Sequence, residues 1–179
     1  MRTLSRRITA LACIFLVASV LSAQTVEPDN KDSCIQFVQS FYDWYVSKAI
    51  VQNRERPWHL AAKHGGKAFD DKLTQALAKS DAEVRSTGDA VLDFDPILNT
   101  QDPAERYVIR EVTRKDGHCL ANVYGVWSRS VPDQGKKPQV VAEIAFENGR
   151  WLFVNFHYPN SSSPKNENLL SILSYHDHR

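Results

Sequence analysis

The sequence predicts an α+β fold in which N-terminal helices pack in a strongly curved antiparallel sheet. Apolar residues recur every three or four positions over roughly the first half of the chain, whereas they alternate with polar residues over most of the second half. An Asn-Gly pair between two alternating runs is a third observation, because it is typical of a tight β-hairpin. Helices followed by strands are the layout of an α+β domain.

The N-terminus has the features of a secretory signal peptide over residues 1–23. Arg2, Arg6 and Arg7 precede an apolar run from Ala10 to Val20, and the small residue Ala23 follows it. The run is shorter than the roughly 20 apolar residues that span a bilayer, which disfavours the alternative of an uncleaved anchor. We therefore expect an exported protein, periplasmic or secreted, with no membrane segment after cleavage of the signal.

Residues 24–31 are polar and are expected to form a flexible lead, and residues 32–179 are expected to form one domain. About 156 residues would remain after cleavage, a length at which a single core buries roughly 70% of the unfolded surface. Loss of three arginines would change the formal net charge from +1 to about −2. A nearly neutral surface argues against a nucleic-acid partner.

Two cysteines, Cys34 and Cys119, follow the predicted signal peptide. In an exported protein such a pair can form a disulfide, and the alternative is two separate buried thiols. No further ligand pair accompanies them at the spacing of a zinc site, so neither a metal nor a cofactor is predicted.

The first helix is expected to begin at an N-cap on Asp32 or Ser33 and to present a broad aromatic face. A second amphipathic helix is expected around residues 69–77. Asp81 is expected to cap a further short helix that ends near Gly88.

The stretch over residues 91–102 is too polar for a regular element, and we expect a structured loop. Asp95 before Pro96 is typical of an Asx-turn. The acidic residues of the loop could instead ligate calcium, but Leu98 stands where an EF-hand requires Gly.

Strands are expected over residues 107–112, 118–128, 140–146 and 151–158, and a short helix is expected near residues 169–173. The Asn148-Gly149 turn sets the register of the last hairpin and pairs Phe146 with Trp151. Strict alternation from this turn places a first set of side chains on the concave face: Val140, Ala142, Ile144, Phe146, Trp151, Phe153, Asn155 and His157. The outer face then carries Val141, Glu143, Ala145, Leu152, Val154, Phe156 and Tyr158.

Three segments together resemble a family of bacterial exported proteins known as domain of unknown function 3828. They are the aromatic helix at 37–45, the Asp-x-Asp-Pro loop at 93–102 that ends in Gln-Asp, and the strand at 151–158 that ends in Asn-x-His-Tyr. The resemblance implies a cone-shaped fold similar to nuclear transport factor two and to the cystatin-like group. It leaves the activity open, since this fold hosts isomerases, dehydratases and binding modules.

In a cone of this kind the concave face forms the ligand pocket. The candidate ligand-binding residues are two polar groups at the strand end and their neighbours: Asn155, His157, Trp151, Phe153, Tyr42 and Asp95. The alternative is that His157 and Asn155 only hydrogen-bond the loop at 93–102 and hold it against the sheet.

We expect a non-enzymatic binding or protein-interaction module that holds a small ligand or a protein partner, in the pocket or on the outer face of the sheet. A homodimer through that face would cover its apolar residues. One alternative is a small isomerase or hydro-lyase with Asp95 or His157 as general base and Asn155 or Tyr42 as hydrogen-bond donor. Another is an immunity-type inhibitor of a secreted toxin. The sequence has no serine-nucleophile elbow, Gly-rich phosphate loop or zinc-protease motif.

Overall fold

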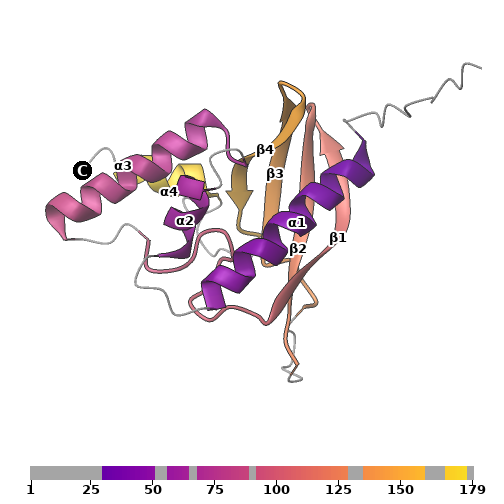
Figure 1. Cartoon of the computed structure of the whole chain (residues 1–179), viewed down its shortest axis with the longest axis horizontal. Coiled ribbons are helices and arrows are strands. Elements are labelled where there is room, and N and C mark those ends of the chain that lie inside the picture. The colour runs from indigo at the N-terminus through magenta and orange to yellow at the C-terminus, as the bar shows by residue number, and fades with distance from the viewer. Residues whose placement is uncertain are drawn as a thin grey trace, which may run out of the picture.

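A computed structural model describes residues 30–50, 56–64, 68–88, 92–128, 135–159 and 168–176. The elements in chain order are α1 (Lys31–Ile50), α2 (Pro57–His64), α3 (Asp71–Thr87), β1 (Arg106–Lys115), β2 (His118–Val126), β3 (Val140–Glu147), β4 (Arg150–His157) and α4 (Leu169–His176). The predicted α+β class is confirmed (Figure 1). The predicted signal peptide lies outside the described residues.

The four strands form one sheet in the order β1-β2-β3-β4, each antiparallel to its neighbour. The predicted tight turn at Asn148-Gly149 is present, and a second one joins β1 to β2 at Asp116-Gly117. Asn148 and Gly149 have φ values of 51° and 78°, and Asp116 and Gly117 have φ values of 53° and 83°, the left-handed pairs that a type I′ turn requires. The predicted pairing of Phe146 with Trp151 is confirmed.

The helix α1 begins earlier than the sequence predicts. Asn30 is its cap: the Ser33 amide donates to the Asn30 side-chain oxygen at 2.7 Å. Asp32 and Ser33 therefore lie inside the first turn, and the end of the predicted flexible lead belongs to the helix.

The helix α3 is one continuous helix rather than two. Asp70 caps its start by accepting from the Leu73 amide at 2.7 Å, and Gly88 ends it with a left-handed φ of 80°. The predicted break at Asp81 does not occur, because Asp81 lies on a helix whose buried face, including Leu73 and Leu77, packs as one unit. Tertiary packing thus overrides a weak local capping signal.

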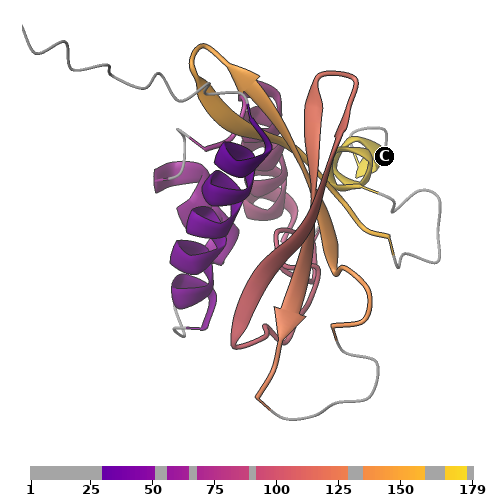
Figure 2. The same cartoon turned by 90° about the vertical axis from the view of Figure 1, so that its right-hand side faces the viewer.

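Figure 2 shows α1 on one face of the twisted sheet and α4 on the opposite side, next to β4. Phe41 of α1 is at the centre of an aromatic core, with its ring 4.6 Å from that of Phe153 and 5.7 Å from that of Phe69. Cys34 and Cys119 are both fully buried in this core, and no disulfide joins them. None of the described helices is long and apolar enough to cross a membrane.

Candidate functional site

A β-bulge in the last hairpin decides which side chains reach the outer face of the sheet. Phe153 pairs with Ile144 and Asn155 pairs with Glu143, so Val154 is an extra residue without a partner on β3. One extra residue reverses the alternation for everything beyond it. Asn155 and His157 therefore lie on the outer face, beside Glu143 and Val141 respectively.

The predicted positions of Asn155 and His157 are wrong. They do not enter the concave pocket, because the bulge turns them to the other face, and neither hydrogen-bonds the loop at 93–102. Phe156 and Tyr158, predicted for the outer face, point inward instead. The hydroxyl of Tyr158 holds the loop by donating to the Pro96 carbonyl at 2.9 Å.

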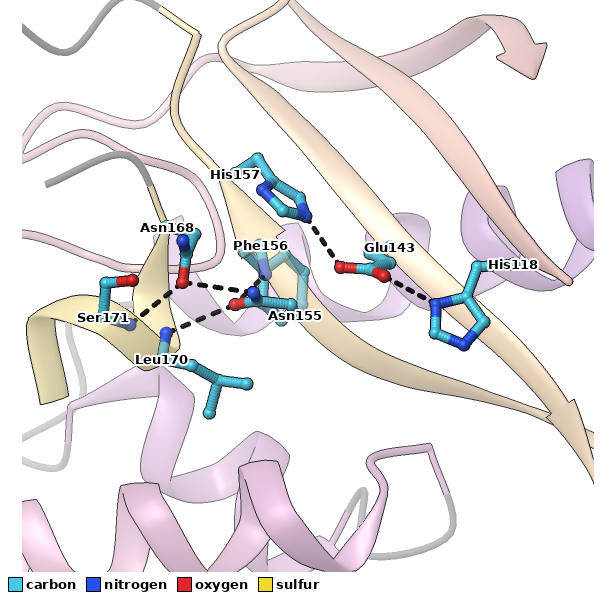
Figure 3. A network of polar contacts seen from close by, with 8 residues as sticks. All are labelled: His118, Glu143, Asn155, Phe156, His157, Asn168, Leu170 and Ser171. Carbon is cyan, nitrogen blue, oxygen red and sulfur yellow. Dashed lines mark hydrogen bonds and ion pairs between the residues drawn. The ribbon is translucent and has the colours of Figure 1, made fainter. Parts of the chain in front are cut away.

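The outer face carries a line of three ionisable side chains from three neighbouring strands, which we call the histidine–glutamate line: His118, Glu143 and His157 (Figure 3). One carboxylate oxygen of Glu143 lies 2.6 Å from His118 Nδ1, and the other lies 2.7 Å from His157 Nε2. The side chains of His118 and His157 are 39% and 37% exposed, whereas that of Glu143 is 21% exposed. Glu143 thus fixes both imidazoles while leaving their rings open to a partner.

The electrostatics of the line favour an ionised Glu143. Burial acts to raise the pKa of this carboxyl, but the hydrogen bonds and charges of His118 and His157 outweigh it and hold the pKa below its ordinary value. Each imidazole has a second ring nitrogen that is not used in its bond to Glu143. The described residues contain no group of three or more His, Cys, Asp or Glu side chains arranged to hold a metal ion.

Asn155 fastens α4 to the end of β4 (Figure 3). Its amide nitrogen donates to the Asn168 side chain at 3.1 Å, and its oxygen accepts from the Leu170 amide at 3.2 Å. Asn168 also accepts from the Ser171 amide at 2.9 Å. These bonds satisfy amides of the first turn of α4 and make Asn155 a positioning residue.

A second polar group occupies the outer face nearer β1. The Tyr124 hydroxyl donates to Glu111 at 2.8 Å, and the Arg110 guanidinium lies 4.4 Å from the centre of the Tyr124 ring. A bulge between Ile109 and Val112 brings Arg110 and Glu111 together there, since two residues of β1 oppose one of β2.

Asp95 and Tyr42, the remaining polar candidates, hold the loop against α1. The Tyr45 hydroxyl donates to one oxygen of Asp95 at 2.7 Å, and the amides of Ile97 and Leu98 donate to the other at 2.9 and 3.0 Å. Tyr42 donates to the Ile97 carbonyl at 2.8 Å. The predicted Asx-turn at Asp95 is confirmed.

Burial raises the pKa of Asp95 to about 6, although its three hydrogen bonds act in the opposite direction. The residue borders a groove of about 440 Å³ that also contains Trp58 and Arg56. Asp95 itself is only 9% exposed, and both of its oxygens already accept bonds, one from Tyr45 of α1 and the other from loop amides. This geometry makes Asp95 a loop anchor rather than an accessible base.

Trp151 and Phe153 lie on the concave face as predicted, but they belong to a packed interior. Phe153 is fully buried and its ring lies 5.0 Å from that of Phe37 and 5.3 Å from that of Phe156. Trp151 is 7% exposed and donates through its indole nitrogen to Ser33 at 3.1 Å. Helix α1 and the loop fill the space that the sequence predicts as an open pocket.

His118 and Glu143 were not predicted as site residues, although the sequence contains part of the signal. Glu143 is a charged residue within the otherwise apolar run from Val140 to Phe146, and His118 directly follows the Asp116-Gly117 turn. Nothing in the sequence marks the bulge at Val154 that brings His157 to the same face.

No protein-family model, curated protein or solved structure significantly matches this chain. The resemblance to domain of unknown function 3828, and with it the fold of nuclear transport factor two, stays a prediction.

Proposed function

We propose that this chain is an exported, non-enzymatic protein-interaction module that binds its partner through the outer face of the sheet. The observation that carries the proposal is the histidine–glutamate line, in which Glu143 holds two half-open imidazoles on three adjacent strands. Preorganised polar groups on a rigid sheet bind with little loss of side-chain entropy.

The composition around the line is that of an interaction surface. Leu120 and Val141 are partly exposed and alternate with the polar Asn122 and Glu143 on the same face. The exposed Arg110 covers the buried ring of Tyr124, and arginine is one of the residue types enriched at binding hot spots. A mixed surface of this kind favours a protein partner over a buried small ligand.

An enzyme of the isomerase or hydro-lyase kind receives less support. Its two candidate bases, Asp95 and His157, lie on opposite sides of the sheet and cannot act on one substrate. Asp95 is committed to Tyr45 and to two loop amides, and His157 is committed to Glu143. His157 keeps a ring nitrogen that its bond to Glu143 does not use, but Asn155 and Tyr42, the donors predicted to act with it, are bonded to Asn168 and to the Ile97 carbonyl.

The edge of the sheet at β1 is a weaker candidate for the partner-binding surface than the outer face. The Gln39 side chain donates to the Tyr107 carbonyl at 2.9 Å and accepts from the Ile109 amide at 3.1 Å. A glutamine of α1 thus takes the place of a neighbouring strand at this point of β1, which hinders pairing with an added strand.

Export rests on the predicted signal peptide at 1–23, so the partner is expected in the periplasm or the medium. Two partners fit the proposal: a second copy of this chain, which would form a homodimer through the sheet, and a secreted toxin that the chain would inhibit.

The test is site-specific photo-crosslinking in the cells that export the protein. A benzoylphenylalanine at Thr113, exposed on the outer face, is compared with one at Gln36, exposed on α1. We expect a discrete adduct from Thr113 that is absent from Gln36 and weaker when Glu143→Gln is added. The adduct mass distinguishes a second copy from another protein. No adduct from Thr113, or equal adducts from both positions, would contradict the proposal.

A further inference from the structure

The shared bonds to Glu143 fix which nitrogen of each imidazole carries a proton. The pKa of Glu143 is held below its ordinary value, so this carboxyl is ionised at neutral pH. An ionised carboxylate can only accept hydrogen bonds, and both rings must therefore donate to it. His118 then carries its proton on Nδ1, and His157 carries its proton on Nε2.

The other nitrogen of each neutral ring is a hydrogen-bond acceptor. These atoms are His118 Nε2 and His157 Nδ1, and neither takes part in the bonds to Glu143 (Figure 3). Both side chains are more than a third exposed, so a partner can reach the rings. While both imidazoles are neutral, the line carries one negative charge and offers acceptors.

The cations of the outer face lie around the line rather than on it. Lys115 is opposite His118 in the register of β1 and β2, at one end of the line. Arg150 is opposite Glu147 next to the hairpin turn, so these two charges offset each other. Arg110 donates at 2.9 Å to a carbonyl of the loop before β3, and its guanidinium is therefore already engaged.

The His157 end of the line is bordered by a second carboxylate. Val141 of β3 pairs with His157 on one side and with Asn122 on the other. The Asn122 side chain donates to Glu111 at 3.3 Å, which places this carboxylate at the same end of the line. Helix α4 packs beside β4, and its residues 169–174 have no charged side chain. The charges at this end therefore favour a cation.

We infer that the histidine–glutamate line binds an arginine or lysine side chain of its partner while both imidazoles are neutral, and releases it when they gain protons. Arginine and lysine have hydrogen-bond donors and no acceptor, which matches acceptors arranged around one negative charge. This inference rests on the proposed function and names the chemistry that its binding surface recognises.

Protonation of the imidazoles reverses the chemistry of the line. Histidine side chains titrate between about pH 5 and about pH 8, whereas carboxylates, lysine and arginine ordinarily keep their charges in that range. A proton on His118 Nε2 or on His157 Nδ1 turns an acceptor into a donor. With both rings protonated, the line changes from one net negative charge to one net positive charge. A cationic side chain then meets donors and like charge, and its binding weakens.

The fixed tautomers can be measured without the partner, by long-range ¹H–¹⁵N NMR of the purified protein at about pH 8.5. We expect the proton of His118 on Nδ1 and that of His157 on Nε2. In Glu143→Gln the side chain has one acceptor oxygen and one donor nitrogen, so one of the two rings should reverse its tautomer. His59 of α2, which is paired with Asp81, should keep its own tautomer. A proton on the opposite nitrogen of either ring in the wild type would overturn the inference.

Binding is tested by photo-crosslinking from Thr113 after the exporting cells and their medium are brought to about pH 8.5 or about pH 5.5. The wild type should form about tenfold less adduct at the lower pH, because losing a hydrogen bond to a charged group weakens binding by about tenfold or more. The double variant His118→Gln/His157→Gln keeps a donor for Glu143 and an acceptor oxygen but cannot gain a proton, so its adduct should depend little on pH. The control His59→Gln, on α2, should keep the pH dependence of the wild type.

The outcomes separate this inference from the proposed function. Equal adducts at both pH values would overturn the inference and leave the proposed function standing. A stronger adduct at about pH 5.5 would also overturn it, since it would show that the partner presents acceptors to the line. A double variant as pH-dependent as the wild type would assign the effect to groups other than the two histidines. The absence of any adduct at either pH would contradict the proposed function, and the inference with it.

Discussion

Substitutions of Asp95 distinguish two possible roles of this residue, an anchor of the loop and a catalytic base. Asp95→Ala leaves the hydroxyl of Tyr45 and the amides of Ile97 and Leu98 without their acceptor in a buried site. Each lost bond lowers the free energy of unfolding by about 1 kcal/mol, so we expect a loss of about 3 kcal/mol. Asp95→Asn keeps one oxygen for both amides and is itself a good Asx-turn residue, so it should lose about 1 kcal/mol or less.

The pH dependence of the free energy of unfolding gives a second, independent test of the role of Asp95. Its folded pKa of about 6 is above the unfolded value, so the native state binds more protons than the unfolded state between these two values. The contribution of Asp95 to the free energy of unfolding therefore rises as the pH falls through about 6. It levels off below the unfolded pKa of about 3.9. Between about pH 7.5 and about pH 5 the wild type should gain roughly 1 kcal/mol relative to Asp95→Asn.

Urea unfolding followed by tryptophan fluorescence measures both effects in wild type, Asp95→Ala and Asp95→Asn. Comparing wild type with Asp95→Asn at each pH removes the contribution of the other titrating groups. An Asn variant that is as unstable as the Ala variant would refute the hydrogen-bond argument. A wild type that gains nothing over Asp95→Asn on acidification would refute the argument from burial.

Three further perturbations test the outer face, the core and the bulge. Glu143→Gln should lower the free energy of unfolding by about 1 kcal/mol at neutral pH, a small loss because the pairs of Glu143 with His118 and His157 are partly exposed. Urea unfolding should show that this difference from the wild type vanishes as the pH falls through the lowered pKa of Glu143. Cys34 and Cys119 should resist alkylation in the native protein and each take one alkyl group after unfolding without reductant, as measured by mass spectrometry. Deleting Val154 should leave Asn155 opposite Glu143 on the outer face, because Asn155 would then follow Phe153 in ordinary alternation, and it should cost only about 1 kcal/mol, again measured in urea.

Each of these predictions has a contrary outcome. Glu147→Gln, exposed at the hairpin turn, is the control for Glu143→Gln, and equal losses in the two variants would show that the histidine pairs contribute nothing. An unfolded, unreduced protein that takes up no alkyl group would reveal a Cys34–Cys119 disulfide. A Val154 deletion that loses about 3 kcal/mol or more would contradict the assignment of Val154 as the extra residue of the bulge.

The elements that could be predicted are those whose signals are local. The Asn148-Gly149 turn requires left-handed φ values that few other pairs adopt, and it sets the register of the hairpin up to Phe153. The Asx-turn at Asp95 is local for the same reason, since the side chain bonds amides only two and three residues away. The start of α1 at Asn30 and the continuity of α3 past Asp81 were missed, because several residues can cap a helix and packing chooses among them.

The candidate site depended on distant parts of the chain. His118, Glu143 and His157 come from three strands, and their side chains meet only when two registers and one bulge are all in place. Alternation alone assigned His157 to the wrong face, since the bulge residue Val154 is an ordinary strand residue with no local mark.

The sequence by itself determined the α+β class, the two tight turns, the four strands and the loop anchored at Asp95, because period, turn chemistry and side-chain bonds act over a few residues. Only the tertiary structure decided that α1 and the loop fill the space against the inner face of the sheet, that Asn155 secures α4 and that two histidines share Glu143 on the outer face. The physical reason is that a single unpaired residue in a strand exchanges the two faces of the sheet for everything after it. Where that exchange occurs is set by packing between strands rather than by any short stretch of sequence.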